Sequence, residues 1–231
     1  MEQAQNGNKN GQNPPRITTG VVFTQFMLGL LLQFVLIVPF LRRAHNRERL
    51  RRQPRQLLAI NHVSLLDTLF IAALCWRSGC YPILVLGDKN IWHGSWLRKF
   101  LSRRTAFLLE RGKLNPNRIL ELQAFGRAGG EFQLIVFPEG TRGDGVNVAA
   151  CQPGIYYIAQ AARIPIVPVF IENMQLVSTK QGRLHPIRGL RKVEVHFGEP
   201  IAPETYLPMP REAFVEFVRR SIAGAKTPKP E

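Results

Sequence analysis

The feature that most limits how this chain can fold is a run of 25 residues, 17–41, that carries no charged side chain. A helix of this length can cross a bilayer core of about 30 Å. Several threonines and glutamines make the run less apolar than an ideal span. We expect a membrane-embedded helix or helix hairpin, with a buried helix of a soluble core as the alternative. A cleaved signal peptide fits less well, because the run is long and no small-residue cleavage site follows it.

An arginine-rich segment follows directly. Residues 42–55 hold seven arginines against one acidic residue, Glu48. Positive charge beside a hydrophobic segment marks the cytoplasmic side of a membrane and attracts anionic lipid headgroups. We therefore expect residues 42–56 to be a juxtamembrane segment. The folded domain should lie on the cytoplasmic face of the inner membrane, in contact with membrane phospholipids.

The overall charge of +15 points to an anionic partner. Nucleic acid is disfavoured, because the densest arginine cluster borders the hydrophobic segment and the chain has no Gly-rich phosphate loop or zinc-finger spacing. The three cysteines form no C-x-x-C pair, which is typical of a reducing compartment without structural disulfides. The cysteines and scattered histidines indicate no zinc site, so we expect no bound metal.

From residue 57 onward, short apolar runs alternate with helical patterns. This alternation predicts one α/β domain over residues 57–222, with a mixed, largely parallel sheet flanked by helices. Residues 1–16 read as a disordered tail and 223–231 as a short basic one. The expected strands are 57–60, 83–86, 107–109, 132–137, 166–171 and 193–197, and the expected helices are 64–76, 92–103, 116–127, 154–163 and 211–222.

A histidine and a carboxylate stand five residues apart after the first of these strands, as His62 and Asp67. Five residues of continuous helix turn through about 500°, so on a helix these side chains would face apart. They can converge only if His62 lies in a loop and Asp67 in the first helical turn, as a general base and its orienting partner would. The alternative is structural, since Ser64 and Asp67 also fit a helix-capping pattern.

A second candidate segment is Phe-Pro-Glu-Gly-Thr-Arg at 137–142, directly after the strand ending near residue 137. Ligands of open α/β sheets bind beyond the carboxyl ends of the strands. Arg142 could clamp a phosphate and Thr141 could donate a hydrogen bond, while Gly140 permits close approach. Glu139 could accept from a substrate hydroxyl or hold an arginine in place. An ordinary turn explains the segment equally well.

Three further segments carry weaker signals. Arg111 follows the expected strand 107–109 and is a second candidate phosphate clamp, although an ion pair with Glu110 is the simpler interpretation. Two prolines at 165 and 168 restrict the pairing of their strand and could shape a wall for an acyl chain, or serve structure alone. Aromatic and basic residues interleave over 92–104, which suits an interfacial helix as well as a core-facing tryptophan pair.

Together these segments resemble the glycerophospholipid acyltransferase family, in particular its 1-acylglycerol-3-phosphate acyltransferase branch. The family's Asn-His-x4-Asp block is present from Asn61 to Asp67, and its Phe-Pro-Glu-Gly-Thr-Arg block is complete. The block Val-Pro-x-x-Pro-Val begins with Ile164. The Gly-x-x-Phe-Ile-x-Arg block is degraded, with Thr105 in place of glycine and only Arg111 retained. That block lies on the acceptor side, so its degradation bears on which acceptor is used.

The resemblance implies a mechanism. His62 would take the proton of an acceptor hydroxyl, and Asp67 would fix its tautomer while the hydroxyl attacks acyl-CoA or acyl carrier protein. Arg111, Glu139, Gly140, Thr141 and Arg142 would bind the phosphorylated acceptor, most simply 1-acylglycerol-3-phosphate, giving phosphatidic acid. No cofactor is implied beyond the acyl donor. The alternatives are another lyso-lipid acceptor, such as a lysophospholipid or a lyso-ornithine lipid, and a non-catalytic membrane-binding protein.

Overall fold

The computed structural model describes residues 19–51, 53–88, 106–109 and 131–226. Within these ranges a mixed sheet has the strand order β1-β7-β6-β2-β5-β3-β4. Its strands are β1 (Leu41–His45), β2 (Arg55–Ile60), β3 (Ile83–Asp88), β4 (Ala106–Leu109), β5 (Phe132–Val136), β6 (Ile166–Glu172) and β7 (Val193–Phe197). The helices expected at 92–103 and 116–127 lie outside the described residues, as do the tail 1–16 and the end of the tail 223–231.

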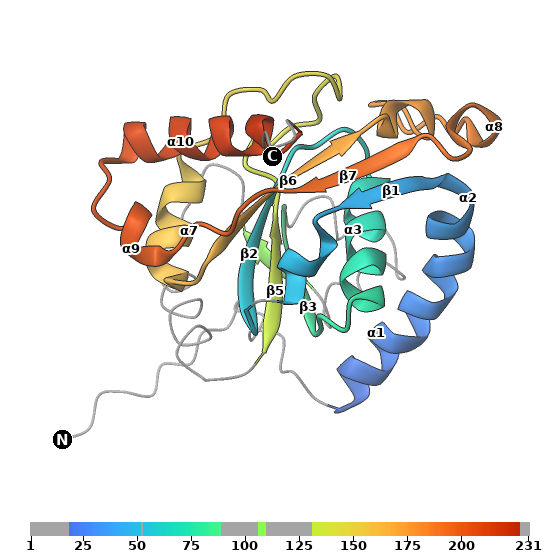
Figure 1. The fold of residues 1–231 in the computed structure, drawn as a ribbon, viewed down its shortest axis with the longest axis horizontal. Coiled ribbons are helices and arrows are strands. Elements are labelled where there is room, and N and C mark those ends of the chain that lie inside the picture. The colour runs from blue at the N-terminus through green and yellow to red at the C-terminus, as the bar shows by residue number, and fades with distance from the viewer. Residues whose placement is uncertain (1–18, 52, 89–105, 110–130, 227–231) are drawn as a thin grey trace, which may run out of the picture.

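The sheet is parallel from β6 through β2, β5 and β3 to β4, and β7 runs antiparallel to β6. β1 then pairs parallel with β7 at the edge. Two helical layers cover it (Figure 1): α3 (Leu66–Arg77) and the N-terminal helix on one face, α7 (Gly154–Ala162) and α10 (Arg211–Gly224) on the other. The mixed, largely parallel α/β architecture predicted from the sequence is confirmed.

The uncharged N-terminal run forms one continuous helical segment rather than a hairpin over the part described. It comprises α1 (Thr19–Leu32), a π-helical stretch η1 (Gln33–Ile37) and the short α2 (Val38–Phe40). By length and composition, residues Val22–Phe40 are apolar enough to cross a membrane. The segment packs alongside α3 (Figure 1), so one side of it belongs to the folded domain.

Polar side chains hold this helix to the domain. Gln25 accepts from the Ile83 amide at 2.8 Å and donates to the Ile83 carbonyl at 2.9 Å. Gln33 donates to the Ala73 carbonyl of α3 at 2.7 Å. The glutamines that make the run less apolar are therefore buried on the domain side, where each has a backbone partner.

The arginine-rich segment 42–56 is more than the juxtamembrane stretch expected from its charge. Leu41–His45 forms the edge strand β1, Arg47–Arg51 forms a 3-10 helix (η2), and β2 begins at Arg55. Leu50 is fully buried in the core. The folded unit thus begins before residue 57, because its edge strand and part of its core come from the segment that the charge pattern assigned to the membrane surface.

The two prolines of the Val-Pro-x-x-Pro-Val block, Pro165 and Pro168, contribute to the sheet. The Pro165 carbonyl accepts from the Leu57 amide at 2.8 Å, and the Pro168 carbonyl accepts from Gly198 at 2.8 Å. β7 ends at Phe197, opposite Val169, so Pro168 sits where the β6–β7 ladder stops and its missing N–H disrupts no strand pair. We assign this segment a structural role.

A glycine lets the N-terminal helix approach α3. A Cβ built on Gly29 would lie 2.5 Å from the Trp76 ring, whereas one on Gly224, at the end of α10, meets nothing within 4 Å. We expect Gly29→Ala to lower the free energy of unfolding by about 1–2 kcal/mol, because overpacking outweighs the better helix propensity of alanine. Gly224→Ala, the matched control, should leave it equal or slightly higher. Thermal unfolding in detergent measures both, and equal shifts would contradict the close packing.

Candidate active site

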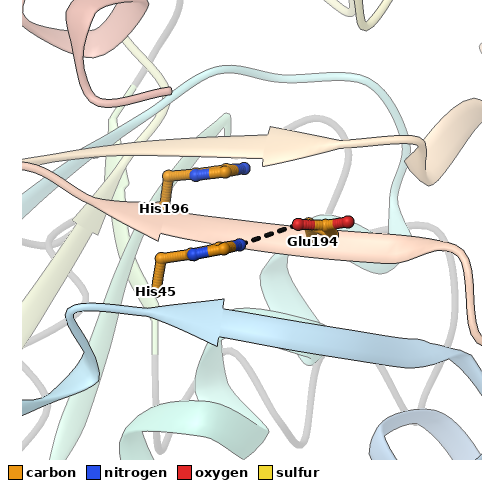
Figure 2. Close-up of side chains that lie close together, drawn as sticks. All are labelled: His45, Glu194 and His196. Carbon is orange, nitrogen blue, oxygen red and sulfur yellow. Dashed lines mark hydrogen bonds and ion pairs between the residues drawn. The ribbon is translucent and has the colours of Figure 1, made fainter. Parts of the chain in front are cut away.

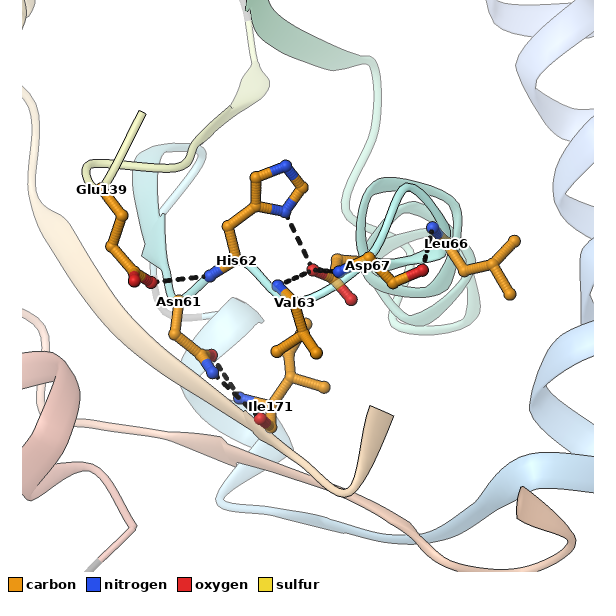
Figure 3. A network of polar contacts seen from close by, with 8 residues as sticks. Asn61, His62, Val63, Leu66, Asp67, Glu139 and Ile171 are labelled. Carbon is orange, nitrogen blue, oxygen red and sulfur yellow. Dashed lines mark hydrogen bonds and ion pairs between the residues drawn. The ribbon is translucent and has the colours of Figure 1, made fainter. Parts of the chain in front are cut away.

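The site lies where two adjacent parallel strands end. β2 ends at Ile60 and β5, its neighbour, ends at Val136. The loop 61–65 after β2 therefore meets the turn 137–143 after β5, at the carboxyl edge where α/β sheets bind ligands. Figure 3 shows the carboxylate of Glu139, from this turn, at the His62 amide and the carboxylate of Asp67, from α3, at the His62 ring.

His62 and Asp67 converge as the loop–helix geometry requires. His62 lies in the loop and Asp67 in the first turn of α3, and Nδ1 of His62 is 3.0 Å from Oδ2 of Asp67. The Asp67 side chain is fully buried, while 16% of the His62 side chain is exposed. A carboxylate oxygen only accepts, so Nδ1 carries the proton and the lone pair of Nε2 is available as a base.

Asp67 also bonds backbone amides, but those of the loop before α3, and the N-cap of α3 is Leu65, which has no side-chain cap. The same Oδ2 atom accepts from the Val63 amide at 2.6 Å and the Ser64 amide at 2.8 Å. Ser64 in turn accepts from the Leu66 amide through its hydroxyl at 3.2 Å. Asp67 thus accepts from amides before the start of α3 and contacts the His62 ring with the same oxygen, so its structural role is compatible with the predicted catalytic one.

The turn after β5 holds the His62 backbone on both sides. Glu139 accepts from the His62 amide at 2.8 Å, and the Gly143 amide donates to the His62 carbonyl at 2.6 Å. The other Glu139 oxygen accepts from the Ala149 amide at 3.1 Å. Burial raises the pKa of Glu139, and these two amide hydrogen bonds oppose the rise. With 2% exposure and both oxygens engaged, Glu139 positions His62 and is not placed to touch an acceptor.

Two residues of the recognised blocks act here without having been singled out by sequence. Asn61 donates to the Ile171 carbonyl and accepts from the Ile171 amide, at 3.0 and 2.7 Å, which joins the start of the loop to β6. Phe137 stacks on the His62 ring, with centroids 4.2 Å apart. Asn61 directly precedes His62, and Phe137 begins the Phe-Pro-Glu-Gly-Thr-Arg block. These positions in the sequence could have pointed to the two residues.

The other predicted binding residues that the structure describes, Gly140, Thr141 and Arg142, lie on the turn after β5. Gly140 has φ +66°, a conformation that favours glycine, and a Cβ there would lie 2.9 Å from Gln152. Gly140 and Thr141 are exposed and Arg142 is half-buried. Among the residues that the structure describes, no carboxylate lies within ion-pair distance of Arg142. Arg111 lies outside the described residues.

A second cluster of chemically capable side chains lies between β1 and β7 (Figure 2). His45 Nε2 is 2.7 Å from Glu194, and the His45 and His196 rings stack at 4.3 Å with 4° between their planes. A zinc–nitrogen bond of about 2.0–2.1 Å lies along the ring lone pair. Two parallel rings so far apart cannot both direct a lone pair at one ion. Glu194 is also paired with Arg42 at 3.2 Å, so we read this cluster as packing at the sheet edge.

A buried carboxylate that fixes one histidine at the carboxyl edge of an α/β sheet is an arrangement suited to general-base chemistry. The comparisons with known proteins agree with this class. The acyltransferase family model matches residues 42–172, more than half of the chain. The chain therefore belongs to the acyltransferase family.

Among its relatives is the 1-acyl-sn-glycerol-3-phosphate acyltransferase of Saccharomyces cerevisiae, 32% identical over 181 residues, covering 74% of this chain and 55% of the relative. A probable 1-acyl-sn-glycerol-3-phosphate acyltransferase of Mycoplasma pneumoniae is 27% identical over 173 residues, covering 72% of this chain and 64% of the relative. The chain thus matches less than two thirds of the length of either.

A solved structure shares the fold. The crystal structure of the 1-acyl-sn-glycerophosphate (LPA) acyltransferase PlsC from Thermotoga maritima superposes with a TM-score of 0.63 at 20% sequence identity. The match covers 91% of this chain and 81% of that one. The likeness supports the arrangement of sheet and helices described above.

The charge of Asp67 can be tested apart from its hydrogen bonds. In Asp67→Asn the amide oxygen can replace Oδ2, which accepts all three donors, and the NH2 group can take the place of Oδ1, which has no hydrogen-bond partner in the described part of the chain. We expect folding to persist and kcat for acyl transfer to fall by about 10²- to 10⁴-fold, because the imidazolium loses its counter-charge. Thermal unfolding and steady-state kinetics measure the two effects, and unchanged kcat would rule out this role.

Proposed function

We propose that the protein is an O-acyltransferase that moves a fatty acyl group from an acyl thioester to a hydroxyl of a lysophospholipid. The acceptor we favour is 1-acylglycerol-3-phosphate, which would give phosphatidic acid. The observation that carries the proposal is the buried Asp67 carboxylate 3.0 Å from Nδ1 of a loop histidine, in a chain of the acyltransferase family.

The proposed reaction follows from this geometry. Nε2 of His62 removes the proton from the acceptor hydroxyl as its oxygen attacks the thioester carbonyl carbon. The carbon–sulfur bond then breaks. The departing thiolate of CoA or acyl carrier protein takes from the imidazolium the proton that came from the acceptor hydroxyl. Asp67 stabilises that imidazolium throughout. The atoms balance without a cofactor, and no covalent acyl-enzyme is required.

Acceptor binding is assigned to the exposed turn after β5. Arg142 offers a planar fork of donors suited to phosphate, and Thr141 adds a hydroxyl on the same turn. Glu139 and Gly140 shape that turn and hold it against His62. Arg111 is proposed as a second phosphate ligand from its place in the sequence block.

We propose that the N-terminal helix attaches the protein to the membrane by lying along the interface. One side of the helix is bound to the domain through Gln25 and Gln33, so a perpendicular span would carry α3 and β3 into the bilayer core. Its other side exposes large apolar side chains, as a helix lying in the interface requires. These are Phe23, Phe26, Met27, Leu30, Leu31, Phe34, Val35 and Val38. The orientation we propose is the cytoplasmic face of the inner membrane.

The function is tested by assaying purified full-length protein in detergent with labelled acyl-CoA or acyl carrier protein. The acceptor panel is lysophosphatidic acid, glycerol-3-phosphate, other lysophospholipids and a lyso-ornithine lipid. We expect transfer to lysophosphatidic acid with either or both donors, and loss of transfer in folded His62→Ala. Transfer confined to another acceptor would retain the chemistry and reject the acceptor. Full activity of His62→Ala would reject the mechanism.

Arg142→Ala should raise KM for the phosphorylated acceptor by about tenfold or more, while KM for the acyl donor changes little, as expected for a lost charge-assisted contact. The control is Arg220→Ala, which removes an exposed arginine paired with Glu216 on α10. Steady-state kinetics with each substrate varied in turn separates the two constants. An equal rise in both KM values would exclude a phosphate-specific role.

A further inference from the structure

A second exposed apolar surface stands apart from the active site, on the segment that joins β6 to β7. Leu184, Ile187 and Leu190 are 63%, 84% and 47% exposed, and they recur every third residue. The short helix α8 (Pro186–Gly189) lies at their centre. We call residues 180–192 the α8 platform. Scattered single apolar residues on a surface are ordinary, but three neighbours at such exposure call for a partner.

The platform is held in place by backbone contacts. The His185 amide donates to the Val177 carbonyl at 2.8 Å, and Ser178 forms a β-bridge with Leu184. Gly189 packs so closely that a Cβ on it would lie 2.4 Å from the Val177 side chain. Because the platform is anchored on its inner side, the apolar side chains have no route to burial within the described part of the domain.

Charge surrounds these apolar side chains and has one sign. Between Glu172 and Glu194 the chain has no acidic residue. In the same interval it has five basic residues, all exposed: Lys180, Arg183, Arg188, Arg191 and Lys192. Exposed aliphatic side chains ringed by lysine and arginine match a surface that is anionic outside and apolar beneath, which describes a bilayer containing acidic lipids.

The platform also contacts the C-terminal end of the N-terminal helix. The Arg191 amide donates to the Pro39 carbonyl at 2.9 Å, and the Arg191 guanidinium donates to the Leu41 carbonyl at 3.3 Å. Val35 and Val38, near that end of the helix, are 52% and 50% exposed. Figure 1 shows α8 and α2 at the same end of the molecule.

We infer that the α8 platform is a second membrane contact, which inserts Leu184, Ile187 and Leu190 among the lipids while its basic residues bind anionic headgroups. The inference rests on the proposed membrane attachment through the N-terminal helix. Two contacts on different elements hold the domain's orientation at the membrane more firmly than the apolar face of one helix alone.

The test attaches an environment-sensitive dye to single surface cysteines of the full-length protein. The native Cys75, Cys80 and Cys151 are buried, and burial raises the pKa of the Cys75 thiol and raises that of Cys151 to about 12, so they remain unreactive thiols. Ile187→Cys reports on the platform. Phe34→Cys reports on the N-terminal helix, where the Phe34 side chain is 69% exposed. Thr205→Cys, exposed on the short helix α9 (Pro203–Tyr206) at the other end of the molecule in Figure 1, is the matched control.

Each labelled protein is mixed with phosphatidylglycerol–phosphatidylethanolamine vesicles carrying brominated acyl chains. We expect blue-shifted, bromine-quenched emission from positions 34 and 187 and none from 205. Vesicles of phosphatidylcholine, or added Arg183→Gln and Arg188→Gln changes, should weaken quenching at 187 more than at 34.

Quenching at 34 without quenching at 187 would overturn the inference while leaving the N-terminal attachment intact. No quenching at either position would overturn both. A change at 187 that depends on protein concentration and appears without lipid would also overturn it, by showing that the platform binds a second copy of the chain. Acyl transfer in detergent is measured separately, so none of these outcomes can be confused with a failed enzyme assignment.

Discussion

The arrangement of the site depends on one buried oxygen. Oδ2 of Asp67 accepts from the His62 ring and from the Val63 and Ser64 amides, so one atom fixes the start of α3, the path of the loop after β2 and the tautomer of the base. Hydrogen bonds to a charged group contribute about 1.5–3 kcal/mol each, and a buried carboxylate without them would be strongly destabilising. Because the loop amides stabilise this charge, it can be held beside His62, where it suits the imidazolium of the proton transfer that we propose.

The rest of the site follows from placing β2 beside β5. Their carboxyl ends lie side by side, so the turn 137–143 contacts the His62 backbone through Glu139 and Gly143. On the other side, Asn61 joins the His62 loop to β6. Three strands therefore position one imidazole. Gly140, Thr141 and Arg142 lie on the same turn 137–143, which is why we propose that this turn binds the acceptor headgroup.

The sequence predicted most strands of the sheet and the way His62 and Asp67 come together. Apolar runs separated by helical patterns predicted the strands now seen as β2 to β7, and the five-residue spacing of His62 and Asp67 required the observed loop and helix start. Strand β1 could not be foreseen, because four of its five residues are polar, charged or small and its pairing partner β7 lies some 150 residues away.

The contacts of Glu139 could not be predicted for a similar reason. A carboxylate beside a glycine turn suggests a substrate ligand, and only the fold shows that both oxygens meet backbone amides. Likewise, the helix periodicity did not reveal that Gln25 and Gln33 face the domain.

The most direct test of the central claim is nitrogen-15 NMR of the imidazole groups in protein labelled at histidine. The resonances of His62 are assigned by their loss in His62→Gln among the five histidines of the chain. For the neutral ring, the account predicts a proton on Nδ1, held by Asp67, and a lone pair on Nε2. A neutral His62 ring with its proton on Nε2 would contradict it, because the lone pair would then lie on Nδ1, facing Asp67, and Nε2 could not take the acceptor's proton.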